Sequence, residues 1–168
     1  MTKFGFYFCA ILIIFLGGCS QNASTPFSTN GELNSSSAKF EGDVSDPGSI
    51  AFFKNNVGDR VLFSIDQSDI DQPGKDILLA QVEWLKINSD YKIVIEGHAD
   101  ERGTRDYNLA LAARRANSAR EFLVSRGIES SRIRTVSFGK ERPAELCSRE
   151  KCYSKNRRAV SVVSNLNF

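Results

Sequence analysis

One short segment gathers the side chains best suited to binding or catalysis: Gly97–Thr104, which reads Gly-His-Ala-Asp-Glu-Arg-Gly-Thr. It contains the chain's one histidine, His98, and two neighbouring acids, Asp100 and Glu101. Alternating apolar residues precede it at Ile93–Ile95 and a helical pattern follows it. We therefore predict a loop between the end of a strand and the start of a helix. Such a loop is exposed while rigid elements hold both of its ends, which suits a functional site.

The helix after this loop places two polar residues on one face. Asn108 and Arg115 are seven positions apart, so they lie within about 20° of each other around the helix, and both are expected to flank its apolar stripe. Arg115 leans back toward the helix N-terminus, where Asp100 lies. Either Asp100 and Arg115 form a salt bridge that fixes the loop, or they are separate clamps for a small zwitterion. In the second case Asp100 holds an ammonium and Arg115 holds a carboxylate.

His98 also permits a catalytic interpretation. A catalytic histidine needs a nucleophile, and Ser64 and Ser137 are only nominal candidates. Asp100 and Glu101 are adjacent in an extended loop, so their side chains point apart, which is poor for paired acid–base work on one bond. A hydrogen-bonded structural role for His98 is the simpler interpretation. No cofactor is expected.

The first 18 residues are typical of an export signal. Lys3 is positively charged, and residues 4–16 form an apolar run. That run is shorter than the about 20 residues of a membrane-spanning helix but suits a signal peptide. It ends in Leu-Gly-Gly-Cys at residues 16–19, the pattern of a bacterial lipobox. We expect residues 1–18 to be removed and Cys19 to carry lipid, which anchors a protein firmly when several acyl chains are present. The alternative is a plain signal peptide with a chance cysteine.

Residues 19–56 are predicted to form the lipidated end and a tether. Ser, Thr and Asn dominate residues 20–39, which cannot bury a core and reach roughly 25 Å as a flexible chain. Residues 40–56 are ambiguous, and Ile50–Phe53 is a candidate for a short helix packed on the domain. Loss of Lys3 leaves 21 of the 22 basic residues against 20 acidic ones. This near-neutral balance gives no indication of nucleic-acid binding.

The cysteines point to one disulfide. Cys9 leaves with the signal peptide and Cys19 takes lipid, so Cys147 and Cys152 remain as an even pair in an oxidising compartment. A bond between them would close a short loop. Free thiols or a metal pair are the alternatives, but one histidine and two cysteines are too few for a convincing zinc site.

A single domain is predicted over residues 57–168. Strands are expected at residues 60–65, 91–96, 132–138 and 158–163, and helices at residues 73–89 and 106–126. Leu78, Val82 and Leu85 mark the core face of the first helix. The stripe of the second helix is expected to be Leu109, Ala112, Ala116, Ala119 and Leu123. Gly127 would cap its end, and residues 140–155 would be a polar loop. This order predicts an α/β sandwich with both main helices on one face of a four-stranded mixed sheet.

The last strand begins with a basic pair. Alternation along the strand puts Arg157 and Arg158 on opposite faces, so one of them is available to a pocket or a partner. The plainer interpretation is a solvated basic strand end.

Several motifs in one order resemble the OmpA-like C-terminal domain family. They are Gly97–Thr104, Tyr107–Leu109, Arg114–Asn117, Ser137–Pro143 and Tyr153–Val160, and the resemblance covers about residues 57–164. The family's helix motif, Asn-x-x-Leu-Ser-x-x-Arg-Ala, falls on Asn108, Leu111, Arg115 and Ala116. Ala112 stands at the position of the motif's serine.

The resemblance implies non-covalent binding of peptidoglycan, without catalysis, through the diaminopimelate of the stem peptide. Diaminopimelate ends in an ammonium and a carboxylate, which fits the zwitterion clamp. The resemblance assigns Asp100 and Arg115 as the ligand pair, with support from Asn108 and Leu111. The family's Phe-Asp-x-Asp segment is Phe-Ser-Ile-Asp here, so Ser64 replaces the first acid and Asp66 is a weaker candidate for the wall.

The resemblance also implies partners and a location. TolB in the periplasm is the expected partner, with TolA as a second, in a system that ties the outer membrane to the wall and constricts it at division. Ser20 after the lipobox cysteine points to the outer membrane, because an Asp there usually keeps similar lipoproteins in the inner membrane. Two alternatives remain: a cell-wall hydrolase using His98 with Asp100 or Glu101, and a module that mainly binds TolB.

Overall fold

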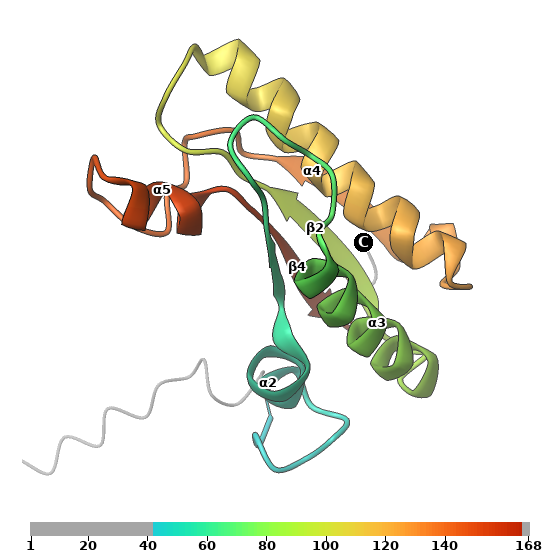
Figure 1. Cartoon of the computed structure of the whole chain (residues 1–168). Coiled ribbons are helices and arrows are strands. Elements are labelled where there is room, and N and C mark those ends of the chain that lie inside the picture. Colours follow the sequence, from blue (N-terminus) through green and yellow to red (C-terminus); the bar gives the residue numbers. More distant parts are fainter. Residues whose placement is uncertain (1–41, 166–168) are drawn as a thin grey trace, which may run out of the picture. The chain divides into compact units, whose positions relative to one another are not determined.

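The computed structural model describes residues 42–165, and the signal segment and Cys19 lie outside this range. A four-stranded sheet in the order β1-β4-β2-β3 forms its centre (Figure 1). Strand β4 pairs antiparallel with both β1 and β2, whereas β2 and β3 are parallel. The mixed sheet predicted from the sequence is confirmed. The strands are β1 (Arg60–Leu62), β2 (Lys92–Gly97), β3 (Ile133–Ser137) and β4 (Arg158–Ser164).

Two long helices cover one face of this sheet, α3 (Gln72–Ile87) and α4 (Arg105–Ser125) (Figure 1). The side chain of Asp71 caps α3 and that of Thr104 caps α4, each by accepting a backbone N–H of the first turn. Gly127 follows α4 with a φ of 95°, a conformation that favours glycine. Both helices therefore begin and end within one or two residues of the predicted positions. The predicted core face of α3 is also confirmed, because Leu78, Val82 and Leu85 are buried.

Helix α4 lies unusually close to β2. A Cβ atom on Gly97 would lie 1.9 Å from the carbonyl oxygen of Ala112, so only glycine fits at that position. Ala112 and Ala116 are fully buried at this contact. Small residues on both elements thus bring the helix start and the strand end together, which sets the position of the loop between them.

The apolar stripe predicted for α4 is wrong at two points. Leu109 is 46% exposed, whereas Leu111 is buried in its place. Asn108 and Arg115, expected to flank the stripe, are buried at 2% and 0% exposure. Their burial is possible because each side chain donates to backbone carbonyls at the edge of the sheet, which satisfies their polar groups.

Within residues 42–56, the segment considered at Ile50–Phe53 as a short helix packed on the domain does pack against the core. It contains α2 (Ile50–Phe52) and a π-helical turn, η1 (Phe53–Gly58). Phe53 is fully buried, and its ring centre lies 4.8 Å from that of Trp84. The indole of Trp84 donates to the Pro47 carbonyl (2.7 Å), and the Tyr91 hydroxyl donates to the Gly48 carbonyl (3.0 Å).

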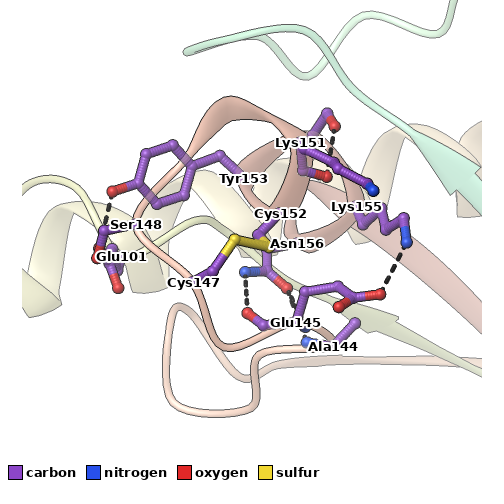
Figure 2. The surroundings of a disulfide bond; sticks show 11 residues. Glu101, Ala144, Glu145, Cys147, Ser148, Lys151, Cys152, Tyr153, Lys155 and Asn156 are labelled. Carbon is purple, nitrogen blue, oxygen red and sulfur yellow. Dashed lines mark hydrogen bonds and ion pairs between the residues drawn. A yellow bond between two sulfur atoms is a disulfide. The ribbon is translucent and has the colours of Figure 1, made fainter.

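The segment predicted as a polar loop over residues 140–155 contains a further helix, α5 (Glu150–Asn156). A seven-residue, largely polar helix has too little apolar periodicity to be recognised in a sequence. Cys147 and Cys152, the pair expected from the sequence, are joined by a disulfide with a Cα–Cα distance of 5.7 Å (Figure 2). A 3-10 turn, η2 (Ser130–Arg132), precedes β3. Within residues 42–165, no helix is long and apolar enough to cross a membrane.

Candidate functional site

A cavity of about 260 Å³ opens beyond the C-terminal end of β2. The loop after β2, the first turns of α4, the turn after β1 and the residue before β4 form its walls. All five residues predicted to bind a ligand line this one cavity: Asp66, Asp100, Asn108, Leu111 and Arg115. The others are Ile65, Ala99, Arg102, Gly103, Tyr107 and Arg157.

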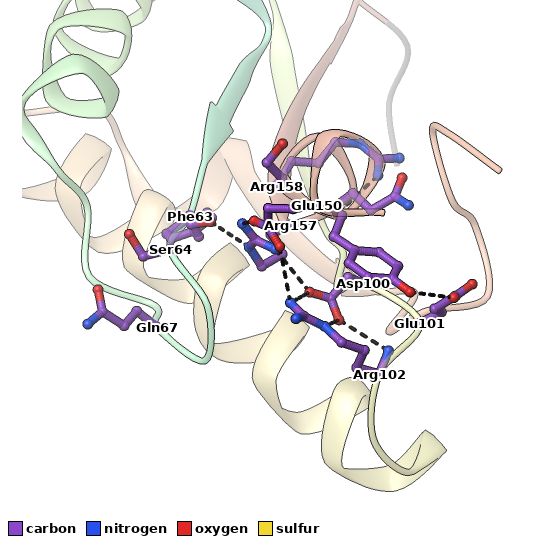
Figure 3. Close-up of polar contacts among 12 residues, drawn as sticks. Phe63, Ser64, Gln67, Asp100, Glu101, Arg102, Glu150, Arg157 and Arg158 are labelled. Atoms are coloured by element: carbon purple, nitrogen blue, oxygen red, sulfur yellow. Dashed lines mark hydrogen bonds and ion pairs between the residues drawn. The ribbon is translucent and has the colours of Figure 1, made fainter. Parts of the chain in front are cut away.

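The carboxylate of Asp100 is held by two arginines (Figure 3). Arg102 donates from Nε to Oδ1 (3.2 Å) and from Nη2 to Oδ2 (2.6 Å), and its backbone N–H also reaches Oδ1 (3.1 Å). Arg157 donates from Nη1 to Oδ2 (3.1 Å). Burial alone would raise the pKa of Asp100, but the hydrogen bonds from Arg102 and Arg157 bring it below its ordinary value. Asp100 is therefore an anion at neutral pH.

Arg115 is held by backbone rather than by an acid. Its guanidinium donates to the carbonyls of Gln67 (2.8 Å), His98 (2.9 Å) and Ser64 (3.1 Å). These bonds use three of its five N–H groups. Burial, and then the charge of Arg157, lower the pKa of Arg115 to about 10, so it remains a cation at neutral pH.

The salt bridge considered between Asp100 and Arg115 is not formed. Within residues 42–165, the ion pairs of Asp100 are with Arg102 and Arg157. Three carbonyls fix the guanidinium of Arg115, while Arg102 and Arg157 occupy both carboxylate oxygens of Asp100. The cavity thus presents an anion and a cation that are held separately.

The other predicted residues support the walls. Asn108 donates from Nδ2 to the carbonyl of Arg102 (2.7 Å), which joins the loop to the helix. Leu111 contributes a buried apolar surface. Asp66, in a left-handed turn with a φ of 57°, accepts a hydrogen bond from the hydroxyl of Tyr107.

Arg102 and Arg157 are the residues that the sequence interpretation did not assign to the site. Arg157 had a partial signal, because alternation at the start of β4 made one of the basic pair available to a pocket or a partner. That residue is Arg157, which lines the cavity. The plainer interpretation of a solvated strand end is wrong, since both arginines are buried. Arg158 turns away and donates to the carbonyls of Asn156 and Arg142 (3.2 Å each). Arg102 had no such signal, because its direction depends on the conformation of the loop.

His98 lies outside the cavity and is buried at 2% exposure. Its ring stacks on Phe138, and the guanidinium of Arg142 lies 3.7 Å from the centre of that ring on Phe138. Neither ring nitrogen makes a close hydrogen bond within the described chain, and Nε2 lies 3.6 Å from a carboxylate oxygen of Glu96. Burial, and then the charges of Arg158 and Arg142, lower the pKa of His98 to about 4. The imidazole is therefore neutral at neutral pH, packed as an aromatic ring and paired with no nucleophile.

Glu101 faces away from the cavity. Its carboxylate accepts from the hydroxyls of Ser148 (2.7 Å) and Tyr153 (2.8 Å). The two adjacent acids therefore have different partners, as the extended loop predicted. Residues 42–165 contain no cluster of His, Cys, Asp and Glu that could hold a metal ion. The arrangement suits reversible binding of a small ligand that carries both charges.

Comparison with known proteins agrees with this geometry. Residues 62–162 match the OmpA family. The peptidoglycan-associated lipoprotein of Mesorhizobium japonicum is 45% identical over 154 residues, which cover 92% of this chain and 88% of the relative. The peptidoglycan-associated lipoprotein of Brucella melitensis is 52% identical over 118 residues, which cover 70% of each chain.

Solved structures give the same result. The crystal structure of the peptidoglycan-associated lipoprotein from Burkholderia pseudomallei superposes with a TM-score of 0.64 at 33% identity, covering 72% of this chain and 98% of that one. The C-terminal domain of Helicobacter pylori MotB, at 22% identity and a TM-score of 0.54, shares the fold alone. These relatives place the chain among binding proteins and not enzymes, so the hydrolase interpretation of His98 with Asp100 or Glu101 is set aside. The chain belongs to the OmpA family and, within it, to the peptidoglycan-associated lipoproteins.

Proposed function

We propose that this protein binds peptidoglycan through the cavity beyond β2, which receives the diaminopimelate side chain of the stem peptide. The observation that carries the proposal is the presence of a fixed anion, Asp100, and a buried cation, Arg115, in the walls of one cavity. In this assignment Asp100 binds the ammonium of the ligand and Arg115 binds its carboxylate. Asn108, Leu111 and Asp66 complete the walls.

Arg115 and Asp100 differ in how much hydrogen-bonding capacity each has left for the ligand. Arg115 still has N–H groups beyond the three that its carbonyl acceptors use. Asp100 is already engaged at both oxygens. Its exposed partner Arg102, at 44% side-chain exposure, is the one that the ligand ammonium displaces, while buried Arg157 stays in place.

The remaining parts of the proposal concern the envelope. Lipid on Cys19 would hold the chain in the outer membrane, residues 20–41 would span the gap, and the domain would hold the wall. Membership among the peptidoglycan-associated lipoproteins supports this arrangement, together with a role in the Tol–Pal system at division, with TolB and TolA as partners. Competition between TolB and wall fragments for the purified protein tests the partner assignment.

Calorimetry with a diaminopimelate-containing muropeptide tests the site itself. The full chain, purified in detergent, is compared with Asp100→Asn, Arg115→Lys and the control Asp106→Asn, an exposed acid outside the cavity wall. Asp100→Asn removes the negative charge and is expected to cost about 2–5 kcal/mol of binding free energy. Arg115→Lys keeps the positive charge but loses the planar bidentate fork, so it is expected to weaken binding less, and the control is expected to bind normally. Binding that is equal in all four proteins contradicts the proposal.

A second titrant assigns the clamps individually. A muropeptide with lysine in place of diaminopimelate keeps the ammonium and lacks the carboxylate. We expect it to bind the wild type less tightly than the diaminopimelate form does, and this difference to be smaller in Arg115→Lys, which lacks the bidentate fork. An unchanged difference in Arg115→Lys contradicts bidentate binding of the carboxylate by Arg115.

A further inference from the structure

Helix α5 is the part of the site region that does not lie on the sheet (Figure 1). It nevertheless reaches the cavity through Glu150, whose Oε1 pairs with Arg157 Nη2 at 2.5 Å and whose Oε2 lies 3.8 Å from Arg102 Nη2. Glu150 is 56% exposed and does not line the cavity, whereas the side chain of Arg157 is 6% exposed and does. The pair thus joins a surface helix to a buried cavity residue.

The guanidinium of Arg157 is held from three directions (Figure 3). Its Nε donates to the carbonyl of Phe63 (3.0 Å), its Nη1 to Asp100 (3.1 Å) and its Nη2 to Glu150. Of these three contacts, Glu150 contributes the second negative charge. A guanidinium is a rigid planar fork, so fixing Nη2 also fixes the direction in which Nη1 meets Asp100.

Helix α5 is itself held firmly, although it is short. The disulfide closes Cys147 onto buried Cys152 within the helix (Figure 2). The side chain of Asn156 accepts the backbone N–H groups of Ala144 and Glu145 and donates to the carbonyl of Glu145. These contacts hold the helix that carries Glu150.

We propose that Glu150, carried on the disulfide-closed helix α5, is a positioning residue that holds Arg157 against Asp100 and so fixes the Asp100 carboxylate for the ligand ammonium. This inference rests on the proposed function for the identity of the ligand. It assigns to the disulfide a role in affinity in addition to stability, because the bond fixes the helix that carries Glu150.

The first test compares Glu150→Ala with Glu145→Ala. Glu145 is in the same segment and is also paired with a cation, Lys155 at 2.8 Å, but it does not contact Arg157. We expect Glu150→Ala to weaken muropeptide binding about three- to tenfold, Glu150→Gln to weaken it less because an acceptor remains, and Glu145→Ala to bind normally. Equal affinities for Glu150→Ala and Glu145→Ala overturn the proposal.

A measurement made without ligand distinguishes a positioning role of Glu150 from a purely electrostatic effect of its charge. Carbon-13 NMR titration of Asp100 gives its pKa in each variant. Removing the negative charge of Glu150 would by electrostatics alone lower the pKa of Asp100. Release of Arg157 instead removes a hydrogen bond from the Asp100 carboxylate and raises that pKa. A rise in Glu150→Ala supports the positioning role, and a fall or no change overturns it.

The second test addresses the disulfide. Reduction by dithiothreitol transfers two electrons and two protons to the Cys147–Cys152 bond, giving two thiols and oxidised dithiothreitol. We expect reduction and the variant Cys147→Ser/Cys152→Ser to weaken binding to a similar extent, about three- to tenfold, and reoxidation to restore it in the wild type. In a Glu150→Ala background, breaking the disulfide should not weaken muropeptide binding further. Additive losses of affinity would show that the disulfide and Glu150 act independently, which overturns the proposed coupling.

The outcomes distinguish this inference from the proposed function. If the wild type does not bind the muropeptide, the proposed function fails, and the pKa of Asp100 alone decides whether Glu150 positions Arg157. If the wild type binds and Asp100→Asn does not, but Glu150→Ala matches Glu145→Ala, the function stands and the positioning role fails.

Discussion

Two of the three arginines that line the cavity, Arg115 and Arg157, are held by contrasting parts of the molecule. Arg115 belongs to a 21-residue helix packed on the sheet, and its acceptors are three backbone carbonyls. Arg157 leads into an inner strand, but two of its three bonds go to the side chains of Asp100 and Glu150. One of those acids is carried by a seven-residue helix closed by a disulfide.

The contrast defines two walls. The core wall is the Arg115 side, where a fully buried guanidinium is held by backbone carbonyls of the turn after β1 and of His98. The surface wall is the Arg157 side, which depends partly on Glu150 of a short exposed helix. Changes at the core wall should therefore reduce stability as well as affinity, and changes at the surface wall should mainly reduce affinity.

The largest effect is expected at the core wall. Arg115→Met would leave the buried carbonyl of His98 and the partly buried carbonyls of Ser64 and Gln67 without this donor, so we expect the free energy of unfolding to fall by about 3 kcal/mol. Urea denaturation measures it. Arg114→Met, one residue earlier and exposed, is the control and should be near neutral. A small effect in Arg115→Met would mean that the two walls do not differ in this way.

The free energy of unfolding should depend on pH through His98. The backbone carbonyl of His98 accepts a hydrogen bond from Arg115, and the backbone N–H of His98 donates to the carbonyl of Arg158. Because the pKa of His98 falls from 6.5 to about 4 on folding, the unfolded chain binds the proton more readily between these values. Stability should therefore fall as the pH drops from 6.5 to 4, by up to about 1.4 kcal/mol per pH unit, with no further loss from this group below pH 4.

Urea denaturation between pH 4 and 7 checks this pH effect. His98→Phe keeps an aromatic ring against Phe138 and removes the titrating group, so its stability should vary less over the same range. An equal pH dependence in both proteins would assign the effect to other groups.

A smaller loss of stability is expected at the surface wall. Cys147→Ser/Cys152→Ser opens a loop with a sequence separation of five residues, and loop closure of this size contributes about 2 kcal/mol. Thermal unfolding measures the loss, with each single serine variant as a comparison. A loss larger than that of Arg115→Met would reverse the comparison between the walls.

The smallest change in stability is expected for Arg102→Met. Its ion pair with Asp100 is 44% exposed on the arginine side, and such pairs contribute at most about 1 kcal/mol. We expect muropeptide affinity to rise, because the ligand ammonium no longer has to displace Arg102 from Asp100. Calorimetry measures the affinity, and Arg105→Met, which is 77% exposed and paired with Glu141, is the control. A loss of affinity would show that Arg102 itself holds the ligand.

Much of this architecture was predictable because it rests on local signals. Caps at Asp71 and Thr104 and a glycine after α4 set the helix ends. Two-residue alternation located β2 and β4. The motif residues assigned from the family resemblance, Asp100 and Arg115 among them, do line one cavity.

The errors arise where tertiary contacts override those signals. Leu109 is apolar but exposed, because α4 turns Asn108 and Arg115 toward carbonyls of distant segments. The pairing of Asp100 with Arg157 spans 57 residues, and the spacing of residues in a sequence does not predict such a distant contact. By contrast, Phe53 joins the core through Trp84, in agreement with the packed segment considered at Ile50–Phe53.

The anchoring of Pro47 and Gly48 has a mechanical consequence. The side chains of Trp84 and Tyr91 donate hydrogen bonds to the carbonyls of these two residues, and the buried ring of Phe53 follows a few residues later in the chain. A force applied at residue 42 would load these contacts in series before it reached β1 and the turn that Arg115 holds. Under such a force, the contacts of Pro47 and Gly48 would break first, at a point remote from the cavity. The cavity would keep its structure, and a bound ligand would stay in place, after this first step of unfolding.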